Sequence, residues 1–136
     1  MKFFVDNCIS PVITRAVRVL AEIQRNEIVH LSEKFEHRDV PDAEWLRVLG
    51  NEREWIVVSG DPRITRGKAE LAAWRESGLT AFFFGKGWAS QSYWRLAGDL
   101  VAWWPSIVLK AREAPTGSGF MIPLRGKDFQ QIFPPK

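Results

Sequence analysis

Several features are scarce or missing in this 136-residue sequence, and each absence excludes a class of protein. Cys8 is the single cysteine, so the chain cannot form an internal disulfide. The two histidines lack the spacing of a zinc finger. The longest apolar runs, Ala81–Phe84 and Leu100–Trp104, are far shorter than a membrane span. The apolar start Met1–Val5 ends at Asp6, which is too short for a signal peptide. We therefore expect a cytoplasmic protein with no membrane partner.

The overall composition is that of a globular domain. Hydrophobic residues make up 46% of the chain and charged residues 26%, which provides enough apolar surface to offset the entropy lost on folding. The net charge of +3 and the isoelectric point near 9.3 allow a polyanionic partner without requiring one. Seven tryptophans are present, and we expect them to contribute mainly to the core.

Apolar segments suited to strands alternate with segments of helical periodicity. Strands are expected at Phe3–Val5, Glu27–Leu31, Trp55–Ser59 and Leu79–Phe84, with a short further strand at Phe120–Leu124. Helices are expected at Pro11–Gln24, Pro41–Leu49, Gly67–Glu76, Ala89–Trp103 and Pro105–Glu113. This alternation predicts a three-layer α/β/α fold with a mainly parallel sheet of four or five strands. We expect one domain over residues 1–113 and a partly flexible tail over 114–136.

Acidic and polar residues stand where the strands are expected to end, which is where α/β folds place their functional crevice. Asp6 and Asn7 follow the first strand, and Asp61 follows the third. Asp42 and Glu44 stand in the first turn of the helix before the third strand. Each residue alone also fits a turn or a helix start. Together, however, they indicate a cation site, because clustered carboxylates repel one another and their oxygens suit Mg²⁺ or Mn²⁺.

Three short motifs follow one another in a characteristic order. They are Phe3-Phe4-Val5-Asp6-Asn7 with Ile9-Ser10-Pro11, then Asp42-Ala43-Glu44-Trp45-Leu46, then Trp55-Ile56-Val57-Val58-Ser59-Gly60-Asp61. In this order they resemble the PIN-like domain family, which includes VapC-type toxin ribonucleases and small bacterial PIN-like relatives. The resemblance extends from Lys2 to about Lys110. It implies a metal-dependent ribonuclease that hydrolyses RNA phosphodiester bonds, as the toxin of a type II toxin–antitoxin pair.

The resemblance also implies roles for individual residues. Asp6, Glu44 and Asp61 would be the catalytic residues and the ligands of one or two Mg²⁺ or Mn²⁺ ions, with Asp42 and Asn7 in the outer shell. The metal would orient and deprotonate a water for attack on phosphorus. RNA is the implied substrate, an antitoxin protein is the implied partner, and a homodimer is an expected state.

Several basic residues and one hydroxyl surround the expected crevice and are candidates for binding RNA phosphates. They are Arg63, Arg66, Lys68, Lys86 and Ser90. Arg66 and Lys68 stand near a helix start, where a cation opposes the helix dipole and therefore hints at an anionic partner. Gly85 and Gly87, on either side of Lys86, would let a phosphate approach the backbone amides. The basic segment Arg125–Lys127 in the tail is expected to be solvated.

Two further functions stay open on the sequence. Many relatives have another acidic residue two positions after the one that Asp61 matches, where this chain has Arg63. That difference favours a non-catalytic PIN-like protein acting by RNA or protein binding. Acidic residues at strand ends with a late lysine, here Lys86, also occur in phosphoacceptor signalling domains. The short helix at Pro41–Leu49 and the sequence Ser59-Gly60-Asp61 favour the ribonuclease over that class.

Overall fold

A single six-stranded sheet organises the protein in the computed structural model, which describes residues 1–37, 39–61 and 66–135. The strands are β1 (Lys2–Val5), β2 (Glu27–His30), β3 (Trp55–Ser59), β4 (Thr80–Phe84), β5 (Gly119–Ile122) and β6 (Gln130–Phe133). Their order across the sheet is β2-β1-β3-β4-β5-β6, and all neighbours are parallel except β5 and β6. The three-layer, mainly parallel α/β fold expected from the sequence is confirmed, with one strand more than expected.

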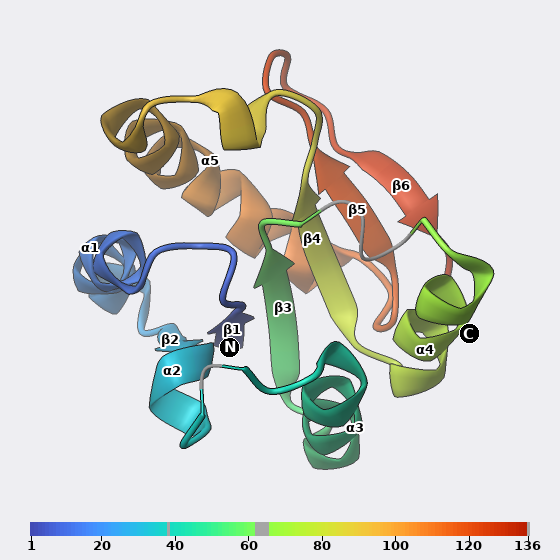
Figure 1. The fold of residues 1–136 in the computed structure, drawn as a ribbon. Coiled ribbons are helices and arrows are strands. Elements are labelled where there is room, and N and C mark those ends of the chain that lie inside the picture. Colours follow the sequence, from blue (N-terminus) through green and yellow to red (C-terminus); the bar gives the residue numbers. More distant parts are fainter. Residues whose placement is uncertain (38, 62–65, 136) are drawn as a thin grey trace.

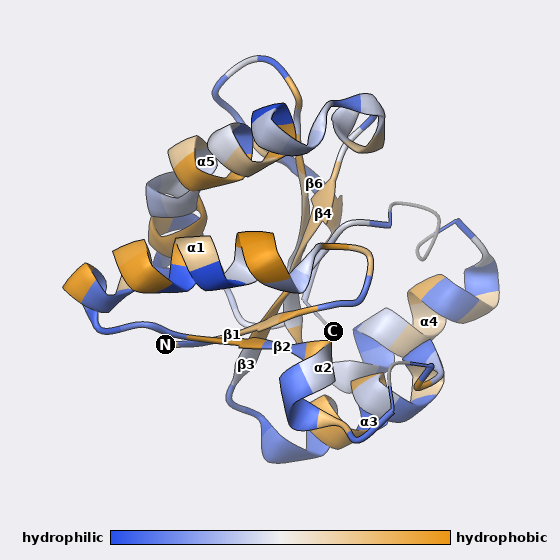
Figure 2. Cartoon of the chain, turned by 60° about the vertical axis from the view of Figure 1, so that its left-hand side comes forward, coloured by the Kyte–Doolittle hydropathy of each residue, from blue (hydrophilic) through white to orange (hydrophobic). Residues whose placement is uncertain are grey.

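Helices cover both faces of the sheet (Figure 1). One face carries α1 (Pro11–Ala21) and α5 (Tyr93–Glu113), and the other carries α2 (Leu31–Lys34), α3 (Asp42–Glu52) and α4 (Lys68–Ser77). Two short 3-10 helices, η1 (Glu22–Gln24) and η3 (Trp88–Ser90), complete the described elements. Figure 2 shows the apolar strands lying between the helices. The core is therefore divided by the sheet into two apolar layers.

Alternation along β1 shows how one strand serves both layers. Phe3 and Val5 pack into the cluster under α1 and α5, whereas Phe4 packs into the cluster under α3 and α4. Successive side chains of a strand point to opposite faces, so a strand buried on both sides must be apolar at every position. The first polar residue after this run, Asp6, consequently stands at the carboxyl edge of the sheet.

The start of α1 sets the direction in which the chain leaves that edge. Ser10 is the N-cap, and its Oγ accepts the N–H of Val12 at 3.1 Å. Pro11 occupies the first helical position, where its missing N–H costs nothing and its fixed φ suits a helix. The predicted helix start is confirmed, and it confines the chain between β1 and α1 to a short loop.

Two predicted helix boundaries are wrong for reasons of packing. Gly50 does not end α3 but lies inside it, where a Cβ would stand 2.9 Å from the carbonyl oxygen of Ser77. Glycine is needed there because α3 and α4 cross closely. Pro105 does not begin a new helix either, since α5 continues through it from Tyr93 to Glu113.

The segment after residue 113 adds two strands to the sheet rather than one. The expected strand is β5, and β6 was not expected because Gln130 and Gln131 give it no apolar pattern. Phe120 and Phe133 are buried, which joins both strands to the core. In the part of the chain that the structure describes, no helix has the length and apolar character needed to cross a membrane.

Candidate active site

Asp6 lies at the point where the strand order of the sheet reverses. Its strand, β1, stands between β2 and β3, with Val5 opposite His30 on one side and Val58 on the other. The connection from β1 to β2 runs over one face of the sheet through α1, and the connection from β2 to β3 runs over the other through α3. Such a switch point leaves a crevice at the carboxyl ends of the strands, which is where α/β proteins bind ligands.

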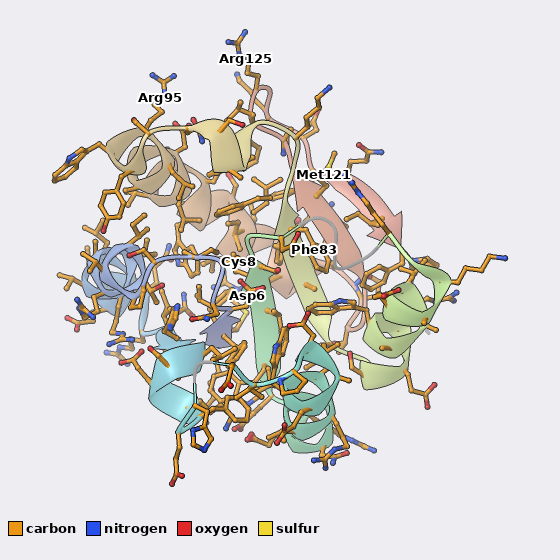
Figure 3. The ribbon with its side chains drawn as sticks, in the orientation of Figure 1. Asp6, Cys8, Phe83, Arg95, Met121 and Arg125 are labelled. Atoms are coloured by element: carbon orange, nitrogen blue, oxygen red, sulfur yellow. The ribbon has the colours of Figure 1, made fainter. Side chains whose placement is uncertain are left out.

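Three donors hold the Asp6 carboxylate in place. Its Oδ1 accepts the backbone N–H of Cys8 at 3.1 Å and that of Gly60 at 3.2 Å, and its Oδ2 accepts the hydroxyl of Ser59 at 2.5 Å. These donors come from the loop after β1 and from the end of β3, so the carboxylate joins the two central strands. Figure 3 shows Asp6 beside Cys8 at the end of β1. Its orientation is thus determined before any ligand binds.

Burial makes this carboxylate unusually basic. Asp6 is only 4% exposed. Burial raises the pKa of Asp6 from 3.8 to about 6, although the hydrogen bonds from Ser59, Gly60 and Cys8 oppose the rise. The negative charge of Asp42 raises the pKa a little further. Among the described residues, no Lys, Arg or His side chain forms an ion pair with Asp6. A carboxylate in this state favours a bound cation.

His30 supports the loop that carries these donors. The Nδ1 of His30 accepts the N–H of Ser32 at 3.0 Å, so its Nε2 carries the proton and donates to the carbonyl oxygen of Ile9 at 2.7 Å. The N–H of Ile9 in turn donates to the carbonyl of Asp6 at 3.2 Å. Because His30 is buried on the strand next to β1, it fixes the loop between Asp6 and Ile9 from the side.

The other predicted acidic residues lie at the same edge but differ in their exposure and in their hydrogen bonds. Asp42 is exposed at the start of α3, and its Oδ1 accepts the indole N–H of Trp45 at 3.0 Å. The charge of Asp42 contributes to the raised pKa of Asp6. Glu44 is exposed in the same helical turn. Asp61 is half-buried, and its N–H donates to Ser59 Oγ at 3.3 Å.

These carboxylates do not form a closed ligand set. Over residues 1–37, 39–61 and 66–135, no three His, Cys, Asp or Glu side chains are gathered as a group that could hold a metal ion. Mg²⁺, however, commonly keeps several waters and is held by one or two carboxylates together with substrate phosphates. Of the candidate carboxylates, Asp42 is one whose charge acts on Asp6. The assignments of Glu44 and Asp61 as ligands stay predictions.

The predicted outer residues are mostly exposed. Asn7 is exposed in the turn after β1. Arg66 and Lys68 are exposed before and at the start of α4, and Lys86 and Ser90 are exposed after β4. Arg63 lies outside the described residues. Trp88 is fully buried and stacks on Phe84 with ring centroids 4.3 Å apart, so it belongs to the core and cannot stack on a base.

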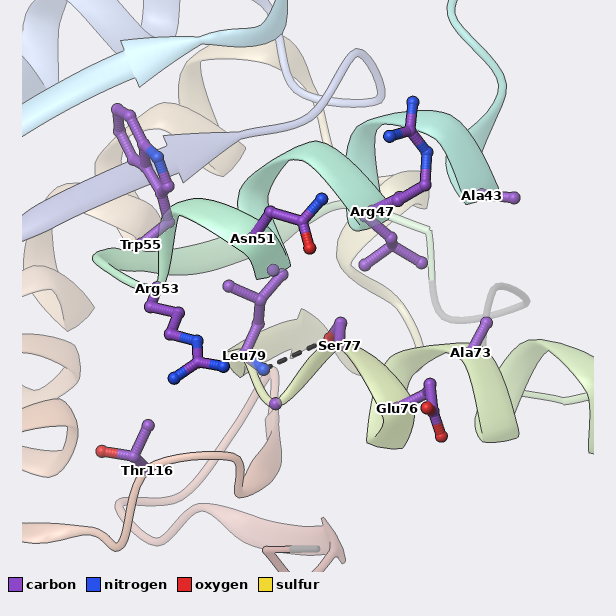
Figure 4. A pocket seen from close by; sticks show the side chains of 13 residues that line it. Ala43, Arg47, Asn51, Arg53, Trp55, Ala73, Glu76, Ser77, Leu79 and Thr116 are labelled. Atoms are coloured by element: carbon purple, nitrogen blue, oxygen red, sulfur yellow. Dashed lines mark hydrogen bonds between the residues drawn. The ribbon is translucent and has the colours of Figure 1, made fainter.

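A cavity of about 790 Å³ lies at the opposite edge of the sheet. Its lining comes from the ends of α3 and α4 and the starts of β3 and β4, and includes Arg47, Arg53, Glu76 and Thr116 (Figure 4). The carboxyl ends of α3 and α4 face this cavity. Their partial negative charge disfavours an anion there and offsets the positive charge of the two arginines. This cavity therefore lies away from the candidate carboxylates, which are at the carboxyl edge of the sheet.

The parallel sheet with an oriented, buried carboxylate at its switch point is the setting in which the family match is read. The model of a family described as PIN like domain matches residues 1–86, which include β1 to β4 and all four candidate acidic residues. The chain belongs to the PIN-like domain family. No curated protein and no solved structure matches it. The family assignment favours the nuclease-type alternatives over the phosphoacceptor class.

Two supporting residues were missed from the sequence. Ser59 was noticed within its motif but was given no role, although it is the polar residue that ends an apolar strand. His30 gave no signal, because its partner Ile9 is 21 positions away and the contact depends on the pairing of β1 with β2. Both act through Asp6 or its loop, and neither is required to touch a substrate.

Proposed function

We propose that the protein is a metal-dependent ribonuclease that hydrolyses phosphodiester bonds at the Asp6 edge of the sheet. The observation that carries the proposal is the buried carboxylate of Asp6, which three donors orient and which no cation among the described side chains neutralises. A divalent ion and the phosphate that it binds would supply the missing positive charge and complete the site. Membership of the PIN-like family supports the same chemistry.

Each residue at the edge has a distinct part in this proposal. Asp6 would bind one Mg²⁺ or Mn²⁺ ion, with Asp42 as the second carboxylate and Glu44 and Asp61 as further ligands. The ion, when bound, supplies Lewis-acid activation of a water and neutralisation of the leaving oxygen. Ser59 and the amides of Cys8 and Gly60 hold Asp6 so that little reorganisation accompanies binding.

We extend the proposal to the toxin half of a type II toxin–antitoxin pair, on the resemblance of three motifs to VapC-type toxins. An antitoxin protein would then bind the chain and block RNA access, and a homodimer stays an expectation. Induction of the chain in growing bacteria should arrest growth, and Asp6→Asn should abolish the arrest. Normal growth with the parent protein would refute the toxin role without touching the nuclease proposal.

A non-catalytic PIN-like protein is the second candidate. It is favoured by the lack of a three-residue metal group among the described residues. Such a protein would bind RNA or a protein partner and would not need Asp6 in its ionised form.

Calorimetric titration of Mn²⁺ into the partner-free protein separates these candidates. The parent should bind the ion, Asp6→Asn should lose binding, and Asp42→Asn should weaken it. Glu113→Gln is the matched control, since it removes one exposed carboxylate outside the family match and away from this edge. Cleavage of a labelled RNA in Mn²⁺ should follow the same order. Absence of both Mn²⁺ binding and cleavage in the parent would leave the non-catalytic candidate.

A further inference from the structure

A basic hairpin projects from the same edge of the sheet as Asp6. We use this name for residues 123–129, which connect β5 to β6. Because β1, β3, β4 and β5 are all parallel, the chain leaves β5 at the edge where β1 ends. The tip contains Arg125, Gly126, Lys127 and Asp128, all exposed. The hairpin lies outside the residues matched by the PIN-like family model, which end at 86.

Apolar contacts anchor the base of the hairpin on both sides. On the outgoing side, Leu124 packs so closely on Gly87 that a Cβ at Gly87 would lie 2.7 Å from its Cδ2 atom. On the returning side, the ring of Phe129 lies 5.1 Å from that of Trp103 and 5.3 Å from that of Phe82. The charged tip is therefore presented from a fixed base, beside the loop that carries Lys86.

Some exposed cations of the described chain are held in ion pairs, and others, in this region as at Arg47 and Arg112, are not. At the edge near β2, Lys2 pairs with Glu54 at 2.9 Å, and Lys34 pairs with Glu52 at 2.6 Å. Lys86, Arg125 and Lys127 form no ion pair with any residue that the structure describes. These positive charges are thus available to an external anion.

Another cation, Arg95, extends from this end of the molecule. Figure 3 shows Arg95 and Arg125 reaching out on the side toward which β3 and β4 point. Arg95 lies in the first turn of α5, where a cation opposes the helix dipole, and its pairing with Asp99 is loose at 3.6 Å. An anion at this end would relieve that unfavourable placement.

We propose that the basic hairpin and Lys86 form a binding surface for the sugar–phosphate backbone of a single-stranded nucleic acid whose scissile phosphate lies at Asp6. The inference rests on the proposed nuclease function. From β1 to β5 the sheet spans three strand spacings, about 14 Å, which a few nucleotides of extended strand cover. Phosphate contacts of this kind position a strand without reading its sequence.

A polynucleotide fits this surface better than a peptide does. Residues 125–128 are three charged side chains and a glycine, so the tip offers no apolar anchor of the kind that dominates protein interfaces. Cations spread along an edge instead suit an anion with regularly repeated charges. Binding should accordingly weaken steeply with salt.

Fluorescence anisotropy with a labelled oligouridylate of about 12 nucleotides tests the surface, in EDTA so that no metal-dependent cleavage occurs. The test variant is Arg125→Ala/Lys127→Ala, and the control is Arg47→Ala/Arg112→Ala, which removes two exposed cations remote from the hairpin. Two lost phosphate contacts should reduce the salt slope by about 1.4 and the affinity by about 25-fold at about 0.1 M salt. The control should bind like the parent. An oligothymidylate shows whether the ribose contributes.

The outcomes separate this inference from the proposed function. Equal binding by the parent and the hairpin variant overturns the inference, even if the parent cleaves RNA. No binding by the parent, or an equal loss in the control variant, overturns it as well. Hairpin-dependent binding by a protein that neither binds Mn²⁺ nor cleaves RNA supports the binding surface, but it refutes the nuclease and with it the placement of a scissile phosphate at Asp6. Hairpin-dependent capture of an acidic peptide in place of the oligonucleotide would assign the surface to a protein partner and overturn the inference.

Discussion

Replacement of Asp6 by Asn should make the metal-free protein more stable at neutral and alkaline pH, although it removes the residue on which the proposed activity depends. Asn has the same shape as Asp, and its carbonyl oxygen can accept the N–H groups of Cys8 and Gly60. Its amide N–H can donate to the hydroxyl oxygen of Ser59, which then acts as an acceptor. The substitution therefore removes the buried charge while it keeps most of the hydrogen bonds.

The size of the effect follows from the pKa of Asp6. Folding raises this pKa from 3.8 to about 6, and each unit corresponds to about 1.4 kcal/mol. The ionised carboxylate therefore lowers the free energy of unfolding by about 3 kcal/mol relative to the protonated form. Between the two pKa values the folded state binds more protons, so stability falls as the pH rises from about 4 to 6 and stays low above. Asn carries no charge, so the variant lacks this loss.

Urea unfolding in EDTA, followed by tryptophan fluorescence at about pH 4 and pH 8, measures the difference. The stability of Asp6→Asn relative to the parent should increase by about 2–3 kcal/mol between these pH values. Asp128→Asn, at an exposed site, should stay within about 0.5 kcal/mol of the parent at both. Saturating Mn²⁺, at about 100 times its Kd, should stabilise the parent by about 2.7 kcal/mol and leave Asp6→Asn unchanged. A stability difference that does not change with pH would refute the reasoning.

Substitutions at three further positions test the surroundings of the site and one helix. Ser59→Ala removes the hydroxyl that donates to Asp6, so the pKa of Asp6 should rise further and Mn²⁺ affinity should fall; a lower or unchanged midpoint in the pH dependence would contradict this. His30→Ala leaves the carbonyl of Ile9 and an amide unpaired and should cost about 2–4 kcal/mol by urea unfolding. His30→Gln should recover part of the lost stability and, with it, part of the Mn²⁺ affinity. A purely structural role would not link the two. Gly98→Ala, where a Cβ meets nothing within 4 Å, should raise stability by about 0.5–1 kcal/mol, and a lower Tm would contradict the open space at that position.

The central strands were predictable because their signal is local. Phe3–Val5, Trp55–Ser59 and the residues of β4 form continuous apolar runs, and such runs in alternation with helices indicate a buried parallel sheet. Pro105 was not predictable in this way, because proline in a helix costs about 3 kcal/mol and is normally read as a break. Trp104 and Ile107 are buried on either side of it, and each contributes about 1.5–3 kcal/mol. Packing on the sheet therefore outweighs the local preference.

The acidic edge was predictable as a region but not in its detail. The predicted end of β1 placed Asp6 at this edge. The predicted end of β3 placed Gly60 there, whose backbone N–H donates to Asp6. The resemblance ranked Glu44 as a ligand and Asp42 as an outer residue, whereas the helical pattern alone could not, because residues two apart on a helix face different directions and the phase of the helix was unknown. Trp45 sets that phase: it is fully buried, and its indole N–H donates to Asp42. The charge of Asp42 is among the causes that raise the pKa of Asp6.

The energetic cost of Asp6 and the position of the basic hairpin are consistent with one electrostatic arrangement. At the carboxyl edge, the described chain places a desolvated carboxylate that no cationic side chain pairs with, and three strands away it places cations that no carboxylate pairs with. If stability alone determined these positions, a direct ion pair between Asp6 and a cation such as Lys86 would reduce both costs. Because Asp6 and the cations of the basic hairpin stay apart, the edge carries one negative site and one positive site. A divalent ion together with the phosphates of a nucleic-acid strand satisfies both sites at once, whereas either ligand alone satisfies only one. Metal and nucleic acid should therefore bind with positive coupling in the parent, and the coupling should disappear in Asp6→Asn while the salt-dependent binding to the hairpin persists.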